Sequence, residues 1–221
     1  MLPTLPRQGP DPMEPSTNTD VFEALRRSIE RAEGFALLVA RVNLPAQQRE
    51  ISAQIEARLV GVVDVQEIDL DGPVEDLAAL LAARVTPATD GRKRVVSVRG
   101  LEHSLPSSAA RHPLLNVLNM KRELLQRTVP HPLVLWLPEY AVRAVAEGAP
   151  DFWAWRSAVL DFTPRADDVD RLWETERPGG SLLEYDNLSA PERRERLRTL
   201  TGLLEEYDAR PDAEGERLLE H

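Results

Sequence analysis

The sequence predicts a three-layer α/β domain built on a mostly parallel sheet of about five strands, and three observations support this prediction. Short apolar runs alternate along the chain with longer segments in which apolar residues recur every three or four positions. The strand candidates are apolar almost throughout, which is typical of parallel strands that crossover helices cover on both faces. The 221 residues, 42% of them hydrophobic, suffice for one ordinary core and a small appendage.

The N-terminal half of the chain contains the first helix and the first two strand–helix pairs. Residues 1–19 are rich in proline and polar residues, which bury too little apolar surface to fold, so we expect a flexible segment. A first amphipathic helix is expected at 20–33, because Asp20 and Glu23 form a capping pair and Gly34 ends the pattern. Strands are then expected at 35–42 and 65–70, and helices at 46–59 and 74–85.

The same alternation continues to residue 165 and completes the predicted sheet. We expect a third strand at 94–98 and a long helix at 113–129. A fourth strand at 133–137 and a short helix at 139–147 follow. The segment 149–151 is expected to turn, and a fifth strand is expected near the end of 152–162. Residues 20–165 form the predicted domain, and Trp136, in the fourth strand, should be buried in its core.

Residues 166–221 are predicted to form an acidic helical extension. Ser189 is followed by Pro191 and Glu192, a pattern typical of a helix start. The apolar stripe of this helix consists of Leu197, Leu200, Leu204 and Tyr207. We expect the stripe to be covered by the α/β domain, by a second copy of the chain or by the next helices of a repeat array. Residues 218–221 resemble the start of an expression tag, so the natural chain is expected to continue further.

Charge and composition argue against several classes of function. With 27 Lys and Arg against 37 Asp and Glu, the net charge of -10 argues against nucleic-acid binding. Residues 166–221 hold 16 acidic and 8 basic residues, so most of the excess belongs to the extension. The chain has no cysteine, which excludes disulfides and thiolate metal sites. No apolar run is long enough for a membrane span, and we expect a cytoplasmic protein.

The sequence lacks the loop that binds phosphate in nucleotide-binding α/β domains. Such a loop follows the first strand, is rich in glycine and ends in Lys and Ser or Thr. Here residues 43–49 (NLPAQQR) contain no Gly and no Lys, and Pro45 removes a backbone donor. The third strand ends in Arg99–Gly100–Leu101–Glu102, which leaves Glu102 as a possible metal contact where paired acids would stand.

Four strings resemble a group of multi-domain bacterial proteins similar to the STAND class of signalling P-loop NTPases. They lie at 96–105 (VSVRGLEHSL), 112–123 (HPLL to RE), 132–140 (PLVLWLPEY) and 149–157 (APDFWAWRS). The resemblance covers about residues 20–165. It implies a P-loop-like domain that precedes tetratricopeptide repeats and is joined to effector domains in signalling or defence proteins. Because the phosphate loop and the acidic pair are absent, it further implies an inactive module without a cofactor.

Other residue clusters allow a functional and a structural interpretation. Trp153, Trp155 and Arg156 could form a cation–π anchor or a phosphate-sensing site, but we expect packing at the domain edge, with Arg156 paired to Asp151 or Asp161.

The remaining clusters are Glu102, His103 and His112 with Ser104, Ser107 and Ser108; Asn116, Asn119, Lys121 and Arg122; and Glu184, Tyr185 and Asp186. No Gly-x-Ser-x-Gly pattern supports a catalytic triad, and no His pair has metal-binding spacing. Charged helix faces and charge runs are usually solvated.

These observations favour a non-enzymatic regulatory or scaffolding domain of a bacterial signalling or defence protein. Its partners would be another protein, other domains of the same polypeptide or a second copy of the chain. The alternative is an ATP-binding switch in which Arg99 or Arg156 replaces the missing lysine. A helical-repeat adaptor that the α/β part merely caps is a third interpretation. An open anion-binding loop at 43–49 would favour the switch, and a loop filled by its own side chains would favour the inactive domain.

Overall fold

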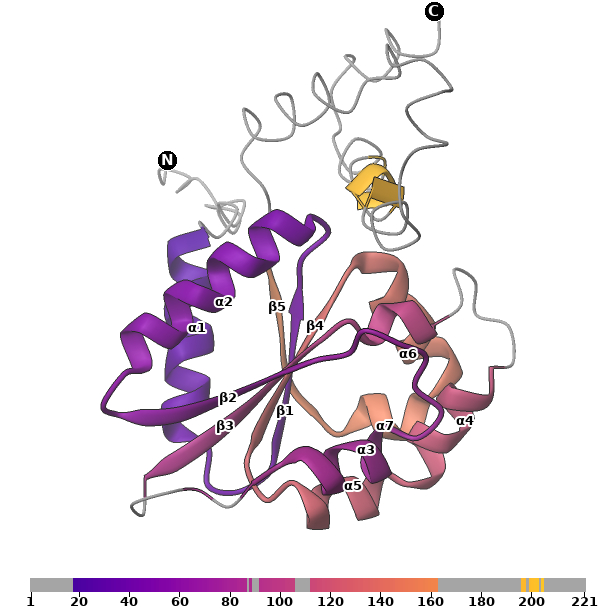
Figure 1. Ribbon diagram of the computed structural model, residues 1–221, viewed down its shortest axis with the longest axis horizontal. Coiled ribbons are helices and arrows are strands. Elements are labelled where there is room, and N and C mark those ends of the chain that lie inside the picture. The colour runs from indigo at the N-terminus through magenta and orange to yellow at the C-terminus, as the bar shows by residue number, and fades with distance from the viewer. Residues whose placement is uncertain are drawn as a thin grey trace, which may run out of the picture.

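The computed structural model describes residues 18–86, 88, 92–105, 112–162, 196–197, 199–202 and 204. They contain a five-stranded sheet in the order β2-β3-β4-β1-β5, in which all strands run parallel (Figure 1). The strands are β1 (Ala36–Arg41), β2 (Val63–Asp69), β3 (Lys93–Arg99), β4 (Pro132–Leu137) and β5 (Arg156–Asp161). The predicted α/β fold with a parallel sheet of five strands is confirmed.

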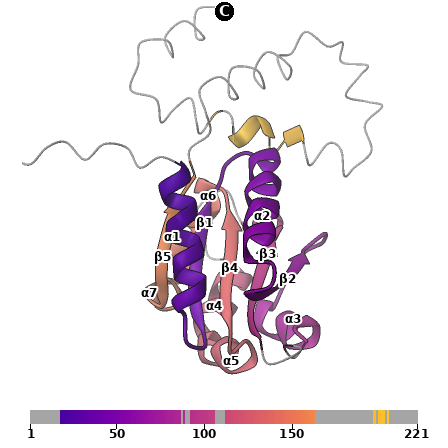
Figure 2. The same ribbon diagram turned by 90° about the vertical axis from the view of Figure 1, so that its left-hand side faces the viewer.

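Helices cover both faces of the sheet and form the two outer layers (Figure 2). On one face lie α1 (Asn18–Arg31) and α2 (Pro45–Leu59). On the other lie α3 (Leu77–Arg84), α4 (Pro113–Met120), α5 (Arg122–Thr128), α6 (Glu139–Gly148) and α7 (Pro150–Ala154), and the 3-10 helix η1 (Leu101–Ser104) follows β3. The connection from β1 to β2 therefore crosses one face, and the later connections cross the other.

Alternating side chains divide each central strand between two cores. Leu37 and Val39 of β1 pack with α3 to α7, whereas Leu38 and Ala40 pack with α1 and α2. Trp136 belongs to the second core and is buried as predicted. Its indole Nε1 donates to Ser97 Oγ at 2.9 Å, so burial leaves this donor satisfied.

The structure departs from the predicted elements in several places. The helix expected at 74–85 spans Leu77–Arg84, and the 3-10 helix η1 was not predicted. The first helix begins at Asn18, two residues earlier than expected. The expected helix at 113–129 is two helices, because the backbone of Lys121 (φ -100°, ψ 13°) leaves the α-helical region between α4 and α5. The expected turn at 149–151 is instead the start of α7, with Pro150 in the first turn, where its missing N–H is harmless.

The predicted boundaries at 1–19 and 166–221 fall largely outside the described residues. Among the helices that the structure describes, none combines the length and the apolar character that crossing a bilayer requires.

Candidate functional site

The carboxyl ends of the five strands meet at one edge of the sheet, which we call the carboxyl edge. In open α/β sheets ligands bind outside this edge, where successive connections leave on opposite faces. Here that point lies beside β1, because α2, which follows β1, packs on one face and α6, which follows the neighbouring β4, packs on the other. The β1–α2 connection and the ends of β2 and β3 lie at this edge.

The β1–α2 connection is short and buried. It consists of Val42, Asn43 and Leu44, which are 3%, 7% and 2% exposed. Pro45 then begins α2 without a side-chain cap from Leu44. No glycine is present to let backbone N–H groups surround an anion, so the connection does not form a phosphate-binding loop.

Polar contacts hold this connection against α6 and β5. The side chain of Asn43 accepts through Oδ1 from the backbone N–H of Glu139 at 2.7 Å. The guanidinium of Arg41 donates to the carboxylates of Glu139 and Asp161, which tie the end of β1 to α6 and to β5. The first N–H groups of α6, which could otherwise face a ligand, are in this way partly used within the protein.

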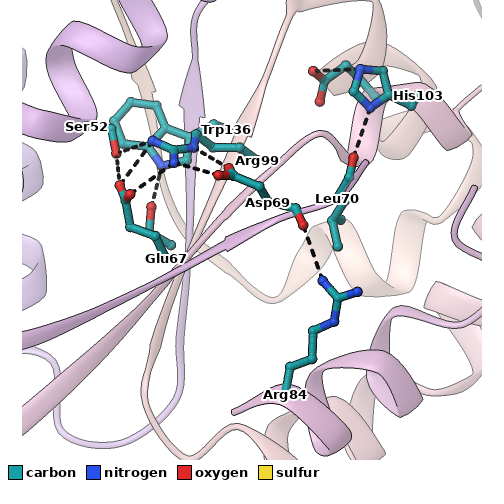
Figure 3. A network of polar contacts seen from close by, with 10 residues as sticks. Ser52, Glu67, Asp69, Leu70, Arg84, Arg99, His103 and Trp136 are labelled. Atoms are coloured by element: carbon teal, nitrogen blue, oxygen red, sulfur yellow. Dashed lines mark hydrogen bonds and ion pairs between the residues drawn. The ribbon is translucent and has the colours of Figure 1, made fainter. Parts of the chain in front are cut away.

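Arg99, a candidate substitute for the missing lysine, is engaged by neighbouring side chains (Figure 3). Its guanidinium donates to both carboxylate oxygens of Asp69, at 2.6 and 3.0 Å, and to those of Glu67, at 3.0 Å each. Ser52 of α2 accepts from Arg99 at 3.1 Å and donates to Glu67 at 2.6 Å. The hydrogen bond to Asp69 raises the pKa of Arg99 above its usual value, burial opposes this, and the charge of Glu67 adds to it. Arg99 therefore links β2, β3 and α2.

A cleft of about 210 Å³ lies beside this network at the ends of β2 and β3. Its lining residues are Gln48, Arg49, Asp69, Leu70, Asp71, Arg99, Gly100, Glu102 and His103. His103 is held by a 3.1 Å contact between its Nδ1 and the carbonyl oxygen of Leu70, and its Nε2 lies 4.0 Å from Glu102. The cleft thus combines carboxylates with guanidinium groups. Within the described part of the chain, no three His, Asp or Glu side chains are grouped to hold a metal.

The second candidate arginine, Arg156, lies at the amino-terminal ends of the strands, opposite the carboxyl edge. It begins β5, in register with Leu37 near the start of β1. The length of β5, at about 3.3 Å per residue, separates it from the carboxyl edge by about 17 Å. Arg156 is thus too far from the β1–α2 connection to replace a phosphate-binding lysine.

The cation–π contact considered as the alternative is present, but the expected ion pair is not. The Arg156 guanidinium lies 4.4 Å from the ring centroid of Trp153 and donates to its carbonyl oxygen at 2.9 Å. The predicted pairing of Arg156 with Asp151 or Asp161 is wrong, because Asp151 lies 3.7 Å from Arg122, and Asp161 pairs with Arg41. Trp155 packs edge-on against Phe35.

Two of the side chains considered for a catalytic triad, Ser104 and His103, make contacts within the fold. The hydroxyl of Ser104 accepts from the backbone N–H of Val74 at 2.7 Å in the buried interior. His112 directly precedes α4. Ser107, Ser108 and the acidic cluster at 184–186 lie outside the described residues.

Asn119 is expected on a solvated helix face, with partner contact or loop capping as alternatives, and in the structure it caps a helix. Its Oδ1 accepts from the backbone N–H groups of Asp151 and Phe152, at 2.8 and 3.1 Å. It therefore caps the first turn of α7 from α4. Lys121, expected on a solvated face, pairs with Asp76 at the start of α3.

The predicted C-terminal helix is described only between residues 196 and 204. Leu197 and Leu204 are 66% and 55% exposed, and Leu200 is half-buried. The prediction that the α/β domain could cover the stripe is therefore wrong for Leu197 and Leu204, and Tyr207 lies outside the described residues. Instead, Gly202 is buried against the carbonyl of Asn43. This contact between the helix and the β1–α2 connection was not predicted.

No family model and no curated protein matches the chain. Solved structures that resemble it include the ORC2 protein of Aeropyrum pernix in its ADP form, with 14% identity and a TM-score of 0.40 over 86% of this chain and 58% of that one. Rif2 in complex with the C-terminal domain of Rap1 has 14% identity and a TM-score of 0.39, over 76% of this chain and 62% of that one. The chain spans about three fifths of the length of each of these proteins.

Proposed function

We propose that this chain is a non-catalytic regulatory or scaffolding domain of a bacterial signalling or defence protein, with a P-loop-like fold that has lost nucleotide hydrolysis. The observation that carries the proposal is the β1–α2 connection, where the buried residues Val42, Asn43 and Leu44 stand at the position of a phosphate loop. A loop without glycine and lysine lacks several charge-assisted hydrogen bonds to phosphate, each worth roughly 1.5 to 3 kcal/mol.

The arginines near the carboxyl edge support the same conclusion. Arg99 is bound by Asp69 and Glu67, so a phosphate would have to displace two carboxylates to reach it. Arg41 is bound by Glu139 and Asp161 in the same way. Both arginines thus act within the fold, and neither replaces the missing lysine.

The partner in this proposal is a protein, either another domain of the same polypeptide or a separate chain. The resemblance to STAND-like proteins favours a following tetratricopeptide array. Leu197 and Leu204, seven residues apart on one helix face and both exposed, provide an apolar surface that such a helix would cover.

Calorimetric titration of the full chain with Mg-ATP tests the proposal, and we expect no heat of binding. A dissociation constant at or below about 100 μM, corresponding to roughly -5 kcal/mol, would overturn it if Arg99→Ala abolished the binding. Arg156→Ala is the matched control, because Arg156 lies at the opposite edge of the sheet and should not affect binding at the carboxyl edge.

The alternative function is a nucleotide-binding switch with a divergent phosphate loop. The cleft of about 210 Å³ at the ends of β2 and β3 favours this alternative, since it places Arg49 and Arg99 near Glu102. Nucleotide binding that Arg49→Ala and Arg99→Ala both weaken would support the switch and contradict the non-catalytic domain.

A further inference from the structure

The C-terminal helix approaches the β1–α2 connection so closely that only glycine fits between them. A Cβ atom at Gly202 would lie 2.2 Å from the carbonyl oxygen of Asn43, 2.9 Å from its carbonyl carbon and 3.5 Å from its Cβ. The first two atoms belong to the backbone, so a side chain at 202 could not be accommodated by a change of rotamer. The contact is therefore a direct approach of two backbones, in which Gly202 is buried.

The surface that receives Gly202 is held in place by contacts on both sides of Asn43. Val42 donates its backbone N–H to the carbonyl oxygen of Leu137 at 3.0 Å. The side chain of Asn43 is fixed by the N–H of Glu139 at 2.7 Å, and α2 begins two residues later. These contacts come from β4 and α6, elements of the sheet domain that lie apart from the helix around Gly202.

The helix occupies the position that a ligand takes in other open α/β sheets. Figures 1 and 2 both place the described helical residues around Gly202 beyond the carboxyl edge, next to the start of α2. This is the region beside β1 where connections leave on opposite faces. A segment of the chain itself thus covers the connection that replaces the phosphate loop.

We propose that the carboxyl edge beside β1 is a docking site for a helix with a small residue at its contact, and that the chain's own helix around Gly202 is the occupant. The inference rests on the proposed function, since it names the partner that this edge binds in place of a nucleotide. At 100° per residue, Gly202 lies roughly 150° around the helix from Leu197 and Leu204. The docked helix therefore turns its glycine to the domain and its two exposed leucines outward.

Gly202→Ala in the full chain tests the docking, because two physical effects of this change have opposite signs. Alanine favours a helix by about 1 kcal/mol relative to glycine, so an undocked helix would exchange its amide hydrogens more slowly. A docked helix would be forced away from Asn43, and exchange should accelerate, about tenfold or more, in segments 199–204 and 43–48. Hydrogen exchange followed by mass spectrometry distinguishes the two outcomes.

Thr201→Ala is the matched control for this experiment. Thr201 is adjacent to Gly202, and its hydroxyl donates to the carbonyl oxygen of Leu197 within the helix. Its replacement raises helix propensity without adding an atom at the contact, so exchange at 43–48 should stay at the parent rate. Amide hydrogen exchange in β4 is the internal reference. If β4 exchanges as slowly in Gly202→Ala as in the parent, the domain remains folded.

Unchanged or slower exchange in both segments of Gly202→Ala would overturn the docking inference and leave the proposed function intact. Faster exchange in β4 as well would also overturn it, because the glycine would then support the whole domain and not a separable contact. Titration of the same variant with Mg-ATP separates the two proposals. Binding that appears only in Gly202→Ala, together with accelerated exchange, would support docking and overturn the non-catalytic function.

Discussion

At the scale of single residues, Gly100 is the position where the candidate site depends most directly on backbone conformation. It lies between β3 and η1 with φ +86°, a left-handed conformation that L side chains rarely adopt. A Cβ atom there would also lie 2.4 Å from the carbonyl oxygen of Leu70, at the end of β2. Two independent constraints therefore require glycine where the carboxyl ends of β2 and β3 meet.

An unfavourable backbone conformation by itself costs roughly 1 to 3 kcal/mol. Gly100→Ala should lower the free energy of unfolding by more than this, because the added Cβ atom also meets Leu70. Gly34→Ala is the control, because Gly34 has nearly the same φ, +88°, but nothing within 4 Å of a Cβ atom. Urea denaturation of both variants gives the two free energies of unfolding. If they lost equal stability, the close approach to Leu70 would have no energetic role.

Trp136 provides a second prediction at this scale. The side chain is 1% exposed, stacks on Phe162 with a centroid distance of 6.1 Å and donates to Ser97. Trp136→Ala should lower the free energy of unfolding by about 3 to 5 kcal/mol, and Trp136→Phe by less. A Trp136→Ala protein that melted within a degree or two of the parent would contradict the role of this residue in the core.

At the scale of elements, Asp76 connects α3 to the break between α4 and α5. Its carboxylate accepts from the backbone N–H of Ala79 at 3.1 Å, as an N-cap does, and also accepts from Lys121. Burial alone would raise the pKa of Asp76, but the hydrogen bonds from Lys121 and Ala79 outweigh it, so the pKa lies below its ordinary value of 3.8. The ionised carboxylate therefore stabilises the folded state.

Asp76→Asn should remove a pH-dependent part of the stability and retain most of the cap. Because the folded pKa is lowered, the contribution of the carboxylate is fully present above the ordinary pKa and is lost as the pH falls through the folded value. The parent should thus exceed Asp76→Asn in stability at pH 7, and the two should converge at acidic pH. Asp71→Asn, at an exposed loop position, serves as control. A difference that stayed constant with pH would contradict this account.

Elements with a regular apolar pattern were predicted from the sequence, and elements held by distant contacts were not. The central strands β1, β3 and β4 follow from apolar runs such as 133–137, because covered parallel strands are apolar on both faces. The edge strands β2 and β5 carry exposed polar residues and are less clearly marked. The sequence predicts a turn at 149–151, where α7 begins, because the cap of α7 is Asn119, 32 positions away from Asp151. The break at Lys121 likewise involves a pairing with Asp76, which no local pattern reveals.

The candidate site was predicted only where its features are local in the sequence. The absence of a phosphate loop is visible in residues 43–49, because this segment contains no glycine and no lysine. The engagement of Arg99 by Asp69 and Glu67 depends on the pairing of β2 with β3, which the sequence does not specify. Gly202 is only a weak local signal, because a glycine inside a helical pattern suggests a packing reason but does not identify the surface it contacts.

At the scale of the whole molecule, association depends on the balance between an apolar stripe and a large net charge. Leu197 and Leu204 are 66% and 55% exposed, so a second copy or a repeat helix could bury them. The net charge of -10 opposes contact between two copies. Salt screens this repulsion, because the Debye length falls from about 30 Å at 0.01 M to about 3 Å at 1 M, while the apolar contribution persists. Self-association should therefore increase with salt.

The last prediction is that Leu197→Asp with Leu204→Asp abolishes this association without affecting the folded domain. The average mass of the parent in light scattering should rise above 24.8 kDa between about 0.02 and 0.5 M salt, as screening shortens the range of repulsion. The double variant should stay at the monomer mass, because it replaces the exposed leucines by further negative charges. Its melting temperature should remain within about 2 °C of the parent, since substitutions at exposed positions change stability little. If the parent and the variant gave the same mass at every salt concentration, the stripe would not bind a second copy. A repeat helix would then be the remaining occupant.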